Sequence, residues 1–252
     1  MSALCGLPIM TKPLLAIAAL VACSGSWAES DSEMNISRQI YDVNELQIIQ
    51  NPVPLRSCTS GVAMTYSLSG VIGPDRTFAM TKLLDRNATC RDHDGNVVVA
   101  PLIYLNSQGG SLDDGYALGR EFRRLGVTVA VGFGSQCASS RAVAFLGGKN
   151  RFVAKEGRVL LYAPYHVGRN EVGGLEVNCD IGVGELAKLR DYYREMTDKE
   201  TSDRLYERTM WYCSAENGWV IKGGAEAELY GLASKRCVSE TLIPMSAAFR
   251  CG

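Results

Sequence analysis

The sequence predicts a single α/β domain in which buried strands alternate with helices. The 252-residue chain is 46% hydrophobic and 21% charged, a balance typical of a globular protein with a sizeable core. Short apolar runs rich in β-branched residues alternate with segments of helical periodicity. No internal repeat or break in composition interrupts residues 60–240, so one domain of ordinary size is expected there.

The expected elements follow one another in order along the chain. Residues 62–72 carry a strand pattern, and Pro74 with Asp75 opens a helix through Leu84. The apolar run from Val97 to Leu105 predicts a strand that is buried on both faces. The later elements are a helix over 112–125, a strand over 127–131, a short helix over 139–146, a strand over 159–162, a helix from an N-cap at Asp180 to Thr197, and a helix over 202–211.

The segments that flank this domain have a different character. Residues 29–59 are polar and mixed, and Asn51-Pro52-Val53-Pro54 is a stiff extended piece, so an N-terminal arm is predicted there. The domain itself is expected over residues 60–240. Residues 241–252 then form a C-terminal tail.

Residues 1–28 are typical of a secretory signal peptide. Lys12 precedes a short apolar run, and Ser26-Trp27-Ala28 provides a small-x-small cleavage site. The apolar run is too short to span a bilayer. Leu20-Val21-Ala22-Cys23 also resembles a bacterial lipobox, so a lipoprotein signal over 1–22 with lipidated Cys23 is the alternative. We therefore expect a periplasmic or secreted protein, or else a membrane-anchored lipoprotein.

The cysteine count indicates the redox environment of the protein, and the net charge limits the classes of partner that it binds. Nine cysteines without a CxxC pair favour an oxidising compartment over a zinc site. Seven remain after residue 28, so at least one is unpaired or pairs with another chain, and Cys137 is the expected one. The pairing of the other six stays open. The formal charge of -1 gives no support to a nucleic-acid partner.

Two turns follow buried strands and precede helices, where α/β folds present backbone N–H groups to ligands. The first contains Gly109 and Gly110, and the second places Ser139 at a helix start. Both turns could bind an oxyanion, and a hydroxyl at Ser139 could act as a nucleophile. Taken singly, each pattern is more often an ordinary tight turn or an N-cap.

Taken together and with their spacing, these turns resemble the family of the Clp protease proteolytic subunit over roughly residues 60–235. The resemblance implies the crotonase-like superhelix of ββα units. Such proteins build rings, so a homo-oligomer with the helix from Asp180 to Thr197 at an interface is possible. The exported, cysteine-containing branch has a Cys-x-Ser-x-Cys turn, in which Arg141 replaces the second cysteine here. The matching segments are Leu105-Asn106-Ser107-Gln108-Gly109-Gly110, Gln136-Cys137-Ala138-Ser139, Phe145-Leu146-Gly147-Gly148 and Glu226-Ala227-Glu228-Leu229-Tyr230-Gly231-Leu232.

The resemblance also assigns roles to individual residues. It implies that Ser139 is the nucleophile and that the backbone N–H groups of Gly110 and Ser140 form the oxyanion hole. The position of the family's general-base histidine holds Tyr162. A tyrosine with its ordinary pKa near ~10 is protonated at neutral pH and does not accept the serine proton. His166, four residues further on, is the candidate replacement base.

The remaining candidate groups have weaker support. The family's acidic residue should fall near Ala215-Glu216, where Glu216 is the nearest substitute and is more typical of a surface loop. Lys149 or Lys155 could serve as a base only if buried, and both have polar neighbours. His93 lies in a turn between two aspartates, which is a weak metal pattern. We expect no metal and no cofactor.

Two functions are therefore open at this stage. The first is an exported serine hydrolase or peptidase that is acylated at Ser139. The alternative is a catalytically degenerate protein of the same fold that binds peptides or a partner protein without turnover. Crotonase-like acyl-CoA chemistry is only a fold-level analogy. In either case the expected partner is a peptide or protein, and a membrane is a partner only if Cys23 is lipidated.

Overall fold

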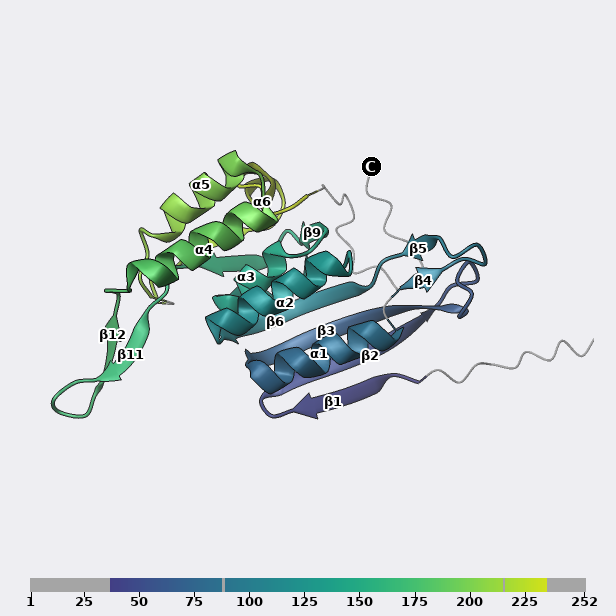
Figure 1. Cartoon of the computed structure of the whole chain (residues 1–252), viewed down its shortest axis with the longest axis horizontal. Helices are drawn as coiled ribbons and strands as arrows, with labels where there is room; N and C mark the ends of the chain where they lie inside the picture. Colours follow the sequence, from purple (N-terminus) through teal and green to yellow (C-terminus); the bar gives the residue numbers. More distant parts are fainter. Residues whose placement is uncertain (1–36, 88, 215, 235–252) are drawn as a thin grey trace, which may run out of the picture. The chain divides into compact units, whose positions relative to one another are not determined.

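The structure is a computed structural model that describes residues 37–87, 89–214 and 216–234 (Figure 1). Contacts divide the chain into Met1–Asn35 and Ile36–Gly252, and every described residue belongs to the second unit. The predicted signal segment with Cys23, the tail over 241–252 and Cys237 lie outside the described residues. Within the described ranges, no helix is long and apolar enough to cross a bilayer.

A nine-stranded mixed sheet forms the centre of the fold. Its main path runs β1-β2-β3-β6-β8-β10-β13, and β7 pairs with both β6 and β9. The strands β3, β6, β7, β8, β9 and β10 pair in parallel, and the outer strands pair antiparallel. The bounds are β1 Gln39–Val43, β2 Leu46–Pro54, β3 Val62–Ile72, β6 Leu102–Gly110, β7 Thr128–Val131, β8 Gln136–Ala138, β9 Asn150–Val153, β10 Arg158–Leu161 and β13 Trp219–Lys222.

The long strand β6 belongs to two stacks of strands. Its first half pairs with β7, whereas Ser107 near its end pairs with Cys137 of β8. Each later ββα unit contributes one strand to each stack. The first strands, β7 and β9, pair with one another in parallel, and so do the second strands, β8 and β10. The helix α2 (Leu112–Arg124) follows β6, and α3 (Ser140–Leu146) follows β8. The predicted α/β fold with ββα units is confirmed.

The helices cover the sheet and pack on one another. Figure 1 shows α2 and α3 side by side, and α4 and α5 as a second pair. The predicted start of α4 was two residues early, because the N-cap is Gly182 rather than Asp180. Asp198 caps α5 through a hydrogen bond from the Thr201 N–H. The other helices are α1 Pro74–Asn87, α4 Val183–Met196, α5 Lys199–Thr209 and α6 Ala225–Leu229.

The segment predicted as an N-terminal arm forms strands over Gln39–Val43 and Leu46–Pro54. The side chains of Leu46, Ile48 and Gln50 alternate inward along β2, which pairs with β3 over its whole length. The polar Gln50 in this alternation and the two prolines at the end of β2 hid the strand pattern. Strand β1 pairs only with Leu46–Gln50, so Pro52 lies where β2 is an edge strand, a position that tolerates proline.

The apolar run from Val97 to Leu105 is two elements rather than one buried strand. Val97–Val99 form β5, which pairs with β4 (Cys90–Arg91) in a small separate hairpin. Val97 is 54% exposed, so the prediction of burial on both faces is wrong for this part. Pro101 lacks a backbone N–H and separates β5 from β6.

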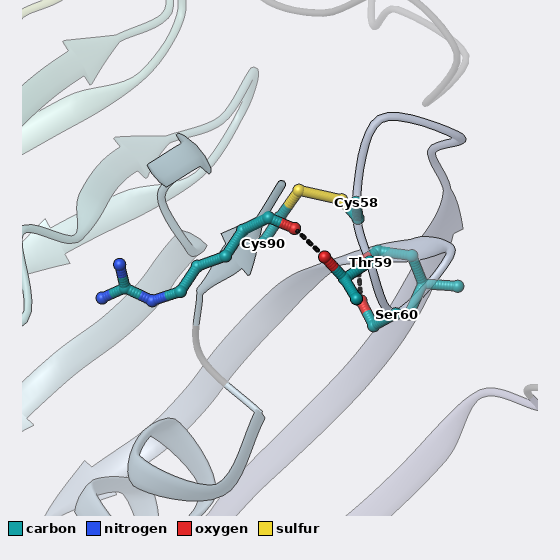
Figure 2. The surroundings of a disulfide bond; sticks show 6 residues. Cys58, Thr59, Ser60 and Cys90 are labelled. Atoms are coloured by element: carbon teal, nitrogen blue, oxygen red, sulfur yellow. Dashed lines mark hydrogen bonds between the residues drawn. A yellow bond between two sulfur atoms is a disulfide. The ribbon is translucent and has the colours of Figure 1, made fainter. Parts of the chain in front are cut away.

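Two disulfides join segments that are distant in the sequence within the part of the chain that the structure describes. Cys58–Cys90 joins the loop after β2 to β4, and the Thr59 hydroxyl beside it donates to the Arg91 carbonyl (Figure 2). Cys179–Cys213 joins the segment before α4 to the segment after α5. Among the described residues Cys137 is a free and fully buried thiol, as expected.

A buried arginine fixes the end of the described chain to the core. Arg151, in β9, donates to the carbonyl oxygens of Leu232 at 2.9 Å and Gly231 at 3.2 Å. It also donates to the carbonyl oxygens of Leu146 and Gly148 at the end of α3. Its guanidinium is therefore satisfied by backbone groups from two distant parts of the sequence.

The helices α2 and α3 approach so closely that side chains are excluded at their crossing. A Cβ atom on Gly147 would lie 1.9 Å from the Gly119 carbonyl oxygen and 2.4 Å from its carbonyl carbon. Both atoms are backbone, so neither could move without displacing α2. This contact sets the depth at which α3 sits against the core.

We expect Gly147→Ala to destabilise the protein by about 2 kcal/mol or more, because the added methyl overpacks two backbones. The matched control is Gly184→Ala in α4, where no atom lies within 4 Å of the added methyl. That change should be neutral or stabilising, since alanine is the better helix former. Urea unfolding of both variants measures the difference, and equal stabilities would contradict the packing argument.

We expect the Cys137 thiol to resist alkylation in the folded protein. Burial raises the pKa of this thiol to about 12, with the nearby Arg141 acting in the opposite direction. The reactive thiolate is therefore scarce at pH 8, and the sulfur is inaccessible. Iodoacetamide should modify the Cys137 peptide only after denaturation, as read by mass spectrometry. Rapid modification of the native protein would show that this strand opens easily.

Candidate active site

Ser139 occupies a strained turn between β8 and α3. Its backbone has φ 54° and ψ −132°, a conformation that residues other than glycine seldom adopt. Its N–H donates to the Leu160 carbonyl of β10 at 3.1 Å, and its carbonyl accepts from the Val143 N–H at 3.0 Å. The turn is thus held from the sheet on one side and from α3 on the other.

Gly109 leaves the space into which Ser139 fits. A Cβ atom on Gly109 would lie 2.5 Å from the Ser139 Cβ and 2.9 Å from the Ala138 carbonyl oxygen. The φ of Gly109 is also 109°, which favours glycine. The Gly109 N–H donates to the Ser107 hydroxyl, and that hydroxyl donates to the Gly70 carbonyl. These contacts fix the glycine turn beside the serine.

Gly110, Ser139 and Tyr162 meet at one cavity of about 310 Å³. They come from the end of β6, the turn before α3 and the residue after β10. None of the lining side chains is charged. The remaining lining residues are Leu112, Val143, Leu161, Ala163, Pro164, Tyr165, Val167, Leu189 and Tyr193. The cavity therefore offers hydroxyl groups within an apolar surround.

The Tyr162 hydroxyl lies beside Ser139 and stays protonated at neutral pH. Burial raises the pKa of Tyr162 to about 12, whereas its interaction with the Ser139 hydroxyl lowers it, and Tyr165 raises it further. The Tyr162 and Tyr165 rings are tilted by 43° to one another, with centroids 5.7 Å apart. The Ala163 N–H donates to the Tyr212 carbonyl at 2.7 Å and anchors this wall. Tyr162 can donate to Ser139 but is not a base.

The structure does not bring His166 into the cavity. His166 begins β11 (His166–Arg169), which pairs with β12 (Leu175–Asn178) in a fully exposed hairpin. Lys149, Lys155 and Glu216 are also exposed and line no part of the cavity. None of these predicted alternatives lines the cavity, although Tyr165 and Val167, on either side of His166, do.

The turn around His93 is a surface turn. The backbone N–H groups of Asp94 and Asn96 donate to the Asp92 carboxylate, and these bonds, chiefly the one from Asn96, lower the pKa of Asp92. His93 itself is exposed. No group of three or more His, Cys, Asp or Glu side chains in the described part of the chain could hold a metal ion.

Ser140 is the first residue of α3 and is fully buried. Its side chain faces α2, because a Cβ on Gly115 would lie 2.9 Å from the Ser140 Cβ. The backbone N–H of Ser140 as an oxyanion donor, together with that of Gly110, remains a prediction. The position of Gly110 on the cavity wall is compatible with it.

Arg141 is a feature of this region that sequence reasoning missed. Its side chain is fully buried, and its Nη2 atom lies 3.5 Å from the Gly70 carbonyl. Its Nε and Nη1 atoms have no hydrogen-bond partner among the described residues. Burial lowers the pKa of Arg141 to about 10, so the group is still a cation at neutral pH. Arginine is seldom buried, and nothing in the local pattern signals this placement.

A second hollow, of about 510 Å³, lies on α5 and has no such chemistry. Five charged side chains line it: Lys199, Glu200, Asp203, Arg204 and Glu207. Lys199 pairs with Asp203, and Arg204 pairs with Glu200, one turn apart. This is a solvated helix surface, so the Ser139 cavity is the candidate site.

Comparison with known proteins agrees with this geometry. A model of the Clp protease family matches residues 98–235, more than half of the chain. A solved structure, a mutant of the 1510-N membrane-bound stomatin-specific protease, is similar at 15% identity with a TM-score of 0.48, covering 67% of this chain and 75% of that chain. No curated protein matches. The family match spans Gly110, Ser139 and Tyr162, and the chain belongs to the Clp protease family.

Proposed function

We propose that this protein binds a peptide segment in the Ser139 cavity without cleaving it. The observation that carries the proposal is the protonated Tyr162 hydroxyl beside Ser139. General-base catalysis needs a group whose pKa lies near the working pH. Burial raises the pKa of Tyr162 to about 12, far above the working pH, so its hydroxyl stays protonated at pH 7. The serine hydroxyl therefore lacks an acceptor for its proton.

The Tyr193 hydroxyl in the cavity does not supply the base either. Burial raises the pKa of Tyr193 to about 12, with a hydrogen bond to Thr209 acting in the opposite direction. The cavity is lined by no His, Lys, Asp or Glu side chain of the described residues. What the cavity retains is shape and hydrogen-bonding capacity, and these serve binding.

A peptide is the ligand that fits the family and the lining. Proteases of this family act on peptide or protein substrates. The apolar side chains of Leu112, Val143 and Leu189 suit one apolar side chain of a ligand. The tyrosine hydroxyls and the Gly110 backbone provide polar partners for a peptide group.

A serine hydrolase is the second candidate function. It is favoured by the φ of 54° at Ser139, since strain of this kind costs on the order of 1–3 kcal/mol and clusters at active sites. Catalysis would then need a base delivered by movement of the hairpin that carries His166, or by a partner. Labelling of Ser139 by a fluorophosphonate probe distinguishes this candidate from peptide binding without cleavage.

We also propose that the protein works in an oxidising compartment, the periplasm or the outside of the cell. Support comes from the disulfides Cys58–Cys90 and Cys179–Cys213, which persist where thiols are not kept reduced. The predicted signal peptide points the same way. Anchoring through a lipidated Cys23 is the alternative form of this proposal.

We also propose that the protein forms a homo-oligomer. Clp-like proteases commonly oligomerise. In the β11–β12 hairpin and at the first residue of α4, Val172, Leu175 and Val183 are between 75% and 91% exposed. A homo-oligomer that covers this region is the simplest occupant, and its subunit number is open.

We expect a fluorophosphonate probe to leave Ser139 unlabelled in the folded native protein between pH 7 and pH 9. Over this range Tyr162 remains protonated, because its pKa of about 12 lies above it. Mass spectrometry of the Ser139 peptide is the readout, with Ser139→Ala as the background control. Labelling of the native protein that disappears in Ser139→Ala would reject peptide binding without cleavage and would show that Ser139 is a working nucleophile.

We expect Tyr162→His to create a reactive serine. An imidazole at this position has a pKa near ~6.5 and would accept the Ser139 proton, so labelling should rise at least tenfold, steeply between pH 6 and pH 8. Tyr162→Phe is the matched control, because it removes the hydroxyl without adding a base. No gain in a folded Tyr162→His protein would mean that the turn itself, rather than residue 162, keeps Ser139 inactive.

A further inference from the structure

The buried Arg141 cation has no counter-ion in the part of the chain that the structure describes. Two of its guanidinium nitrogens have no hydrogen-bond partner, and the ionisable group that acts on it is the Cys137 thiol. That thiol is protonated at neutral pH and carries no charge. A full positive charge is therefore enclosed in the interior, two residues after Ser139, where solvent screens it little.

A short chain of hydrogen bonds connects this cation to the wall of the cavity. Arg141 Nη2 lies 3.5 Å from the Gly70 carbonyl, which also accepts from the Ser107 hydroxyl. The Ser107 hydroxyl in turn accepts from the Gly109 N–H at 3.0 Å. Gly109 is adjacent to Gly110, which lines the cavity. Hydrogen bonds through Gly70 and Ser107 therefore connect the cation with the glycine turn that borders the cavity.

The cavity itself contains no charge that would cancel this field. Its twelve lining residues are glycine, serine, proline, tyrosine and aliphatic types. Unlike charges attract strongly across a low-dielectric wall. An anionic group on a ligand is therefore favoured at the glycine turn, whereas a neutral amide at the same place gains less from the cation, which acts only on its dipole.

We propose that the ligand is the C-terminal end of a peptide, with its free α-carboxylate at the glycine turn and an apolar last side chain in the cavity. This inference rests on the proposed function and specifies which part of a peptide binds. The α-carboxylate supplies the anion, and Leu112, Val143 and Leu189 surround the apolar side chain. Internal peptide segments, which have no carboxylate at that point, bind more weakly.

The test compares two fluorescein-labelled pentapeptides that end in Leu-Leu and differ only in a C-terminal carboxylate or carboxamide. Fluorescence polarisation with the full-length mature protein gives both Kd values. We expect the carboxylate peptide to bind at least tenfold more tightly. Equal Kd values would overturn the inference and leave peptide binding intact, whereas no binding of either peptide would reject the proposed function as well.

Three variants test whether Arg141 is the source of the preference. Arg141→Met replaces the cation by an apolar side chain of similar length, and buried unpaired charges can be replaced in this way without loss of stability. We expect an unchanged or higher Tm and a preference below twofold. Arg141→Lys keeps the charge and should keep most of the preference. Arg124→Met removes an exposed cation that pairs with Glu121 and should change nothing.

The outcomes of this series are distinguishable. A preference that survives in folded Arg141→Met would overturn the role of the cation, as would its loss in Arg124→Met. If Arg141→Met does not fold, the comparison of the two peptides on the native protein and on Arg141→Lys still decides the inference. A native preference that Arg141→Lys abolishes while folded would also count against a simple charge effect.

Discussion

The structure depends on the close approach of backbones around the turn that carries Ser139. Gly109 lies directly against the Ser139 side chain, and Gly147 lies against the backbone of α2. Each contact leaves no room for a methyl group, and together they determine where α3 begins and how deep it lies. The strained φ of Ser139 is maintained because the hydrogen bonds to Leu160 and Val143 hold both sides of the turn. The cavity is a consequence of this packing.

The turn and its reactivity are separate properties of the fold. Backbone contacts with β6, β10 and α2 fix the position of the serine hydroxyl, and these contacts do not involve residue 162. Its reactivity depends on whether a neighbouring side chain can accept a proton. A tyrosine at position 162 fits the same half-buried space and donates where a histidine would accept. The scaffold of a protease can therefore persist in a protein whose serine is only a polar wall of a binding site.

Much of the fold and part of the site follow from the sequence for local reasons. Gly110, Ser139 and Tyr162 each end a strand pattern, and the ends of neighbouring parallel strands meet, so their convergence was predictable. The strand Leu46–Pro54 was missed because Gln50 breaks its apolar alternation, and the exposure of Val97 was missed because a short apolar run does not reveal what covers it. The burial of Arg141 and the exposed hairpin at His166 depend on tertiary packing, for which one sequence contains no periodic signal.

The hydrogen bonds of Arg151 to backbone carbonyl oxygens constrain the order in which the domain folds. Its guanidinium needs acceptors from Gly231 and Leu232, about eighty residues further along the chain. Until those residues have been synthesised, a folded core would enclose a cation with half of its partners absent, which is costly. We therefore expect this part of the core to complete its packing only after residues 231 and 232 have been synthesised. A chain that lacks residues 231 and 232 leaves the buried Arg151 side chain with acceptors only from Leu146 and Gly148, so the end of the domain helps to stabilise its middle.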